Sequence, residues 1–127
     1  MTINTNPVRT LQLLQKAVEE RGEDYVYPVE WKTASSADAA VMTLCMYVQP
    51  DGSGPACIAG YVMHEYGASL DFLKKHEGET TTNPGRELGV DTMSLILLFD
   101  AQGVQDQGLP WGQALARARM RYASESF

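Results

Sequence analysis

The pattern of apolar and polar positions is clearest near the start of the chain. Apolar residues recur there at spacings of three and four between polar ones: Leu11, Leu14 and Val18. That periodicity is typical of an amphipathic helix. Asn6 can cap its N-terminus, Pro7 suits the first helical position because no backbone donor is needed there, and Gly22 can end it. The sequence therefore predicts a first helix from Pro7 to about Gly22.

Two later segments have the composition of strands. Residues 25–31 are rich in β-branched and aromatic side chains, and Pro28 restricts this segment to an edge strand or an extended chain. Residues 41–48 are also β-prone. They run into the dense turn sequence of residues 50–55, which favours a strand there, although residues 37–44 could also be helical. The small polar stretch from 33 to 38 is expected to be a loop.

Two helices and a loop are expected in the middle of the chain. Pro55 begins the first of these helices and Gly67 closes it. Ser69 caps a short second helix over residues 70–76. Residues 78–89 include the run Thr-Thr-Thr-Asn-Pro-Gly, and we expect them to form the most exposed and mobile loop of the protein.

Two further helices are expected towards the C-terminus. Asp91 caps the first, and apolar residues cover all of its sides over residues 93–99, so it should be the buried central helix. Pro110 begins the last helix. One apolar stripe should dock that helix on the core: Trp111, Leu115, Ala118 and Tyr122. The predicted fold is α+β and mostly α, a single globular domain over residues 1–127. About five helices pack around the central one, with a short β-hairpin or two short strands.

Composition narrows the class of protein. The chain has 127 residues, 44% hydrophobic and 20% charged, which are globular values. Its formal charge of −6 argues against a general binder of nucleic acid or anionic membranes, which needs a basic surface. Two cysteines are too few for a disulfide scaffold, and the N-terminus lacks the pattern of a secretory signal. We therefore expect a cytoplasmic protein with free thiols.

Cys57 is the first candidate for chemistry. A thiol in the first turn of a helix lies near the positive end of the helix dipole, which favours the thiolate. A nucleophilic thiol also needs a base within hydrogen-bond reach. His64 follows seven residues later, about 10 Å along the helix axis and too far for a direct pair, while His76 on the next helix could fold back. The alternative is a buried cysteine that packs as a small apolar residue, and this interpretation is favoured.

A zinc site is the second candidate. Cys45, Cys57, His64 and His76 form a nominal Cys2His2 set with gaps of 11, 6 and 11 residues. Structural zinc sites pair their ligands at gaps of about two to five residues, and no such pair exists here. A metal site is therefore not favoured, and no cofactor is expected.

Two further groups of residues bear on binding. Arg117, Arg119 and Arg121 give the last helix a basic side, but steps of two residues rotate by about 200°, so they do not form one stripe. Aromatic residues gather in the first half of the chain, and any that are exposed together would indicate a binding face. These are Tyr25, Tyr27, Trp31, Tyr47, Tyr61 and Tyr66.

Two stretches of the sequence carry a resemblance. One is Cys45-x-Tyr47-Val48 followed by Pro55-Ala56-Cys57-Ile58-x-Gly60. The other is Ala101-Gln102, then Gln105-Asp106-x-Gly108-x-Pro110-Trp111-Gly112-x-Ala114. On these residues the chain resembles a group of small proteins encoded by actinobacteriophages, such as mycobacteriophages, and by their hosts. The resemblance implies a phage origin and a location in the host cytoplasm, and it implies no particular activity.

The functional hypotheses follow from these observations. The favoured one is a small accessory protein that binds a host or phage protein, and a homodimer is also open. An enzyme is the less favoured alternative, and it would be a thiol- or zinc-dependent one centred on Cys57. The other alternative is a DNA-associated regulator that uses the C-terminal helix. Membrane association is not expected, and nucleic-acid binding is not favoured.

Overall fold

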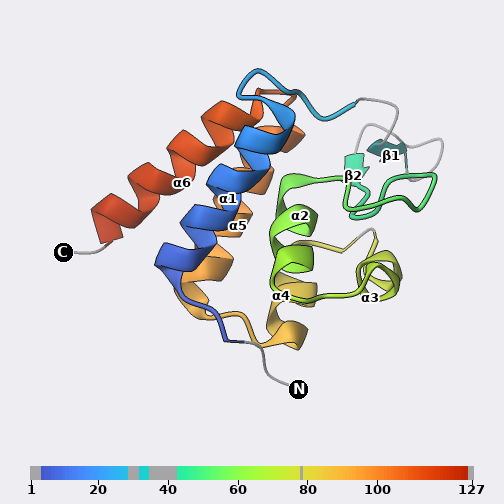
Figure 1. Cartoon of the computed structure of the whole chain (residues 1–127), viewed down its shortest axis with the longest axis horizontal. Helices are drawn as coiled ribbons and strands as arrows, with labels where there is room; N and C mark the ends of the chain where they lie inside the picture. Colours follow the sequence, from blue (N-terminus) through green and yellow to red (C-terminus); the bar gives the residue numbers. More distant parts are fainter. Residues whose placement is uncertain (1–3, 29–31, 35–42, 78, 126–127) are drawn as a thin grey trace.

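The structure is a computed structural model, and it describes residues 4–28, 32–34, 43–77 and 79–125 (Figure 1). Its elements, in chain order, are α1 (Pro7–Arg21), β1 (Lys32–Ala34), β2 (Thr43–Cys45), α2 (Ile58–Glu65), α3 (Leu70–Lys75), α4 (Thr82–Leu88), α5 (Thr92–Asp106) and α6 (Trp111–Glu125). Within the described residues there are thus six helices and two strands of three residues each.

Three long helices form the body of the fold. Helices α1, α5 and α6 pack side by side, and α2 packs against α1 and α5 (Figure 1). Helix α3 contacts α2, and α4 contacts α5. The buried core draws on each long helix, with Leu14, Leu97, Leu98 and Ala118 all fully buried. Burial of such side chains is the main force that holds the helices together.

The starts of α1, α3 and α5 follow the predicted caps, whereas α2 begins at Ile58 and not at the predicted Pro55. The side chains of Asn6, Ser69 and Asp91 each accept a hydrogen bond from the backbone N–H three residues later, at the starts of α1, α3 and α5. Gly22 follows α1 with φ 99°, a value that other residues rarely adopt. The predicted docking stripe of α6 is also confirmed, because Trp111, Leu115 and Ala118 are buried.

The loop after α1 caps the start of α6. The backbone N–H groups of Trp111 and Gly112 donate to the carbonyls of Tyr25 (2.8 Å) and Glu23 (2.9 Å). A Cβ atom on Gly112 would lie 2.8 Å from the Glu23 carbonyl oxygen, so this crossing needs glycine. Arg21 strengthens the junction, since its guanidinium lies over the Trp111 ring at 4.9 Å and donates to the carbonyls of two loop residues that precede α2.

The predicted α+β class is wrong, because the fold is all-helical in its architecture. Helices form all of its layers, and β1 and β2 pair antiparallel only with each other. Residues 25–28 contain no strand, and 29–31 and 35–42 lie outside the described residues. The aromatic residues Tyr27 and Tyr47 are buried in the helical core, so apolar packing explains the β-like composition of these segments.

Three other expectations also need correction. Thr33 and Ala34, expected in a loop, belong to strand β1. The predicted loop of residues 78–89 contains helix α4, in which Pro84 stands in the first turn, where proline is tolerated. The predicted burial of α5 on all sides is also wrong. Leu97 and Leu98 are buried, whereas Phe99 is 56% exposed. One side of α5 therefore faces outward with an apolar surface.

Candidate functional site

Cys57 stands at the start of α2 as its N-cap, one residue before the first helical turn in which it was expected. Its side chain is fully buried, and the sulfur accepts a hydrogen bond from the Gly60 N–H at 3.3 Å. A Cβ atom on Gly60 would lie 2.8 Å from the Tyr47 carbonyl oxygen. Glycine at this position therefore makes room for α2 to pass close to the backbone of Tyr47.

Two buried glutamines of α5 complete the cap of α2. The Ile58 N–H donates to Gln105 Oε1 at 2.8 Å, and the Ala59 N–H donates to Gln102 Oε1 at 3.1 Å. The first N–H groups of a helix have no partner within the helix. Here three side chains satisfy three of them, so the N-terminus of α2 has no donors left at these positions for an anion.

This arrangement joins the two stretches that carry the resemblance. The first contributes Cys57 and the start of α2, and the second contributes Gln102 and Gln105. Their contact lies wholly inside the protein, because all of these residues are buried. The parts of the two stretches that meet here therefore form a packing junction rather than a surface. The capping role of these two glutamines was not predicted from the sequence. The available signal was their spacing of three residues, which places both on one face of an apolar helix.

Neither histidine forms a hydrogen bond with the Cys57 thiol in the part of the chain that the structure describes. His64 lies in the last turn of α2, and its Nδ1 pairs with the Ala68 carbonyl at 2.8 Å. His76 follows α3 and pairs with two glutamates. The structure thus places the thiol at one end of α2 and gives both imidazoles other partners.

The predicted zinc ligands are not brought together as a described site. The backbone of Cys45 belongs to β2, but its side chain lies outside the described residues. Within the residues that are described, no group of three or more histidine, cysteine, aspartate or glutamate side chains could hold a metal ion.

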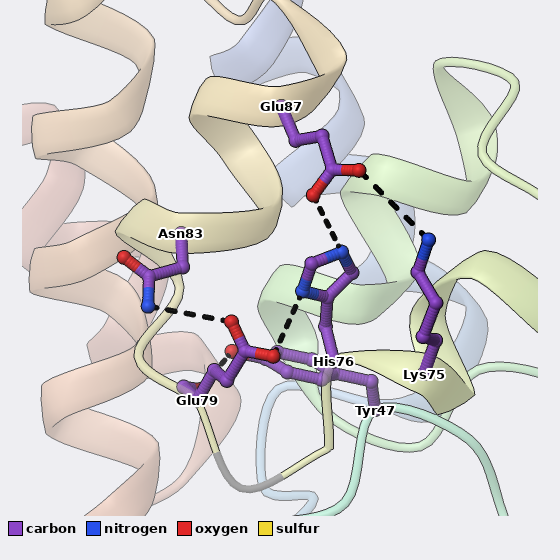
Figure 2. Close-up of polar contacts among 6 residues, drawn as sticks. All are labelled: Tyr47, Lys75, His76, Glu79, Asn83 and Glu87. Carbon is purple, nitrogen blue, oxygen red and sulfur yellow. Dashed lines mark hydrogen bonds and ion pairs between the residues drawn. The ribbon is translucent and has the colours of Figure 1, made fainter.

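His76 takes part in a polar cluster at the smaller helices α3 and α4 (Figure 2). Its Nδ1 lies 3.0 Å from Glu79 Oε2, and its Nε2 lies 2.9 Å from Glu87 Oε2, although the second pair lacks hydrogen-bond geometry. The Tyr47 hydroxyl donates to the Glu79 carbonyl at 2.5 Å, and Asn83 donates to the Glu79 carboxylate. The cluster thereby ties α3 and α4 to the segment that follows β2.

The electrostatics of this cluster agree with a structural role. The hydrogen bond with His76 is the main cause that lowers the pKa of Glu79, and the bond from Asn83 adds to it. The carboxylate therefore stays ionised beside the imidazole. The His76 side chain is only 9% exposed, and its ring also packs on Phe72 at 4.7 Å between centroids. The ring is enclosed by its own helix and its two carboxylate partners.

The three arginines of α6 have three different environments. Arg119 donates to Gln15 on α1 at 2.8 Å. Arg121 pairs with Asp100 on α5 at 2.7 Å, and this pairing raises the pKa of Arg121. Arg117 is exposed, and no described carboxylate lies within ion-pair distance of it. The expectation that these residues form no single stripe is confirmed.

An apolar groove lies between α4, α5 and α6. It has a volume of about 320 Å³, and three apolar residues of α5 line it, which we call its floor: Leu95, Ile96 and Phe99. Arg86 of α4 and Arg121 of α6 also line the groove. Leu95 can lie close to α4 because residue 85 is glycine, where a Cβ atom would meet the leucine side chain. We refer to this feature as the α5 groove.

A second hollow adjoins the α5 groove along α6. It has a volume of about 230 Å³ and shares Arg121 with the groove. Its other lining residues are Arg117, Met120 and Ser124. Met120 is 68% exposed and Phe99 56%, the two highest values among the exposed large hydrophobic residues of the described chain. The two most exposed of these side chains thus lie on α5 and α6.

The aromatic residues of the first half do not provide this surface. Tyr27, Tyr47 and Tyr61 are buried, and Tyr25 and Tyr66 are half-buried against the core. Trp31 lies outside the described residues. The binding face that these residues could have indicated is therefore absent at the five described positions.

Comparisons of the chain with family models, with curated proteins and with solved structures found no match. A separate search of the described helices found none long and apolar enough to cross a membrane.

Proposed function

We propose that this protein acts by binding another protein through the α5 groove. The observation that carries the proposal is the exposed apolar floor of that groove, which includes Phe99. Apolar side chains that lie together on a surface can mark a protein interaction site or a binding groove. Aromatic residues beside a concavity are also the usual anchors of protein interfaces.

The other two hypotheses receive less support from the contacts. The Cys57 thiol is enclosed and accepts a hydrogen bond from its own helix, so a substrate would have to open the core to reach it. Two of the three α6 arginines are engaged within the protein, which leaves few cations for a DNA backbone. Protein binding through the α5 groove requires neither access to the buried thiol nor further cations.

A second part of the proposal concerns the origin and the compartment of the protein. The resemblance on the two quoted stretches supports a phage-encoded accessory protein that works in the host cytoplasm. The partner is then a host or phage protein that meets it there. This part of the proposal is independent of the groove and needs its own test.

A site-specific crosslink tests the proposal. The photo-reactive amino acid p-benzoylphenylalanine replaces Phe99 in the full chain, and the protein is irradiated in an actinobacterial lysate with and without phage infection. A defined adduct, identified by mass spectrometry and reproduced with the purified partner, is expected. The same amino acid at Val8, which is 52% exposed on α1, is the control. Equal crosslinking from both positions would refute the groove as the binding site.

A further inference from the structure

The α5 groove combines an apolar floor with unpaired positive charge, in a protein that is acidic as a whole. The chain carries a net charge of −6, yet the groove and the adjoining hollow are lined by Arg86, Arg117 and Arg121. Asp100 also lines the groove, but its side chain is only 9% exposed and is bound to Arg121. The available charge on this face is therefore positive.

Two of these guanidinium groups are open to a partner. Arg86 and Arg117 are exposed, and among the described residues no carboxylate lies within ion-pair distance of either. A guanidinium binds a carboxylate through parallel hydrogen bonds, which are stronger than those between neutral groups. The groove and the adjoining hollow thus combine apolar side chains with guanidinium groups that can bind carboxylates.

From this combination we infer that the occupant is an acidic amphipathic helix of another protein. Large apolar side chains of that helix enter the groove, and its Glu or Asp residues meet Arg86 and Arg117. The walls of the groove are helices and offer no strand edge, so the partner docks by its side chains, as amphipathic helices do in apolar grooves. This inference rests on the proposed function and specifies its partner.

Charge argues against a second copy of this chain as the occupant. A symmetric contact would bring Arg86, Arg117 and Arg121 of one copy towards the same residues of the other. Among the described residues that line the groove, the only acidic one is Asp100, and it is already bound to Arg121. Like charges opposed across an interface disfavour association. A carboxylate-rich partner removes that repulsion.

A displayed peptide library tests the inference directly. The library consists of 16-residue helices with large apolar residues at helical spacing and with Glu, Lys, Gln or Ala at random in the other positions. It is selected against the full chain and, in parallel, against Phe99→Asp. Val8→Asp is the matched control for that substitution, because Val8 has a similar exposed fraction on another helix.

The affinities of the selected peptides are then measured on charge variants. We expect enrichment of Glu, loss of binding to Phe99→Asp and not to Val8→Asp, and a decrease of at least about tenfold on Arg86→Glu with Arg117→Glu. Arg9→Glu, at an exposed arginine of α1, should have no effect. Affinity should also fall as salt increases, because the rim contacts are ionic.

The outcomes separate the inference from the proposed function. Peptides that need Phe99 but show no preference for Glu would overturn the acidic partner and leave the groove as a binding site. The absence of any peptide that needs Phe99 would overturn both. A homodimer in sedimentation that Phe99→Asp abolishes would overturn the inference in favour of a second copy. Circular dichroism confirms that each variant is folded.

Discussion

The cap of α2 by Gln105 leads to a prediction whose size can be worked out from the structure. Gln105 is fully buried, and its Oε1 accepts the Ile58 N–H at 2.8 Å. Gln105→Leu keeps a similar volume and removes the acceptor. Because Ile58 is also fully buried, water cannot replace it. An unsatisfied buried donor costs about 1–3 kcal/mol.

That cost is large compared with the stability of a small domain, which is about 5–15 kcal/mol. A loss of about 2 kcal/mol corresponds to a decrease in Tm of about 7 °C for a chain of this length. Gln12→Leu is the matched control, because Gln12 is exposed on α1. Urea unfolding followed by circular dichroism measures the free energy of unfolding of both variants.

Hydrogen exchange adds a local measurement. The Ile58 amide should lose protection in Gln105→Leu relative to amides in the middle of α6, because its hydrogen bond is gone. Gln102→Leu should act in the same way on Ala59, and the two substitutions should not be additive because they affect one helix end. A Gln105→Leu protein as stable as Gln12→Leu, with Ile58 still protected, would refute the capping role.

Three other predictions test the structure at different points. Cys57 should resist alkylation by iodoacetamide in the folded protein and react in urea, because its sulfur is enclosed. Peptide mapping by mass spectrometry measures the alkylated fraction of Cys57, and rapid alkylation of the folded protein would contradict the prediction. Burial opposes ionisation of Asp91, but hydrogen bonds lower its pKa overall. The ionised Asp91 should therefore stabilise the fold above the unfolded pKa of about 3.9, and this contribution should be lost as the pH falls through the folded pKa. In urea unfolding, Asp91→Asn should lose less free energy of unfolding than the wild type as the pH is lowered. Gly60→Ala should destabilise the protein by about 1–3 kcal/mol, because the added Cβ meets the Tyr47 carbonyl. Gly103→Ala has open space around it and should stabilise the protein by up to about 1 kcal/mol. Thermal melts in which both substitutions shift Tm in the same direction would contradict this packing.

Local signals in the sequence were sufficient for most helix ends. Asn6, Ser69 and Asp91 cap helices because a short polar side chain satisfies a nearby backbone N–H, and this needs no tertiary contact. Helix α4 could not be predicted in the same way. Its start, Thr81, forms no side-chain cap, and Pro84 and Gly85 within it are typical of turns. Contact with α5 provides the support that its sequence lacks.

The candidate site was the part least accessible from sequence. Leu95, Ile96 and Phe99 were assigned to the core because α5 is apolar on all sides. Only the positions of α4 and α6 decide which of these residues remain exposed. Whether Arg86 and Arg117 have ion-pair partners likewise depends on which side chains the tertiary packing brings near them. An apolar helix with more apolar faces than one core can cover was the signal that could have indicated a binding surface.

The most direct test of the account is the affinity of the purified crosslinked partner for three forms of the full chain. These are the wild type, Phe99→Asp and Val8→Asp, compared by isothermal titration calorimetry. A substitution at a central apolar anchor should weaken binding by at least about tenfold, so Phe99→Asp is expected to lose affinity while Val8→Asp matches the wild type. Equal affinities for all three forms, or a loss confined to Val8→Asp, would contradict the α5 groove as the binding surface.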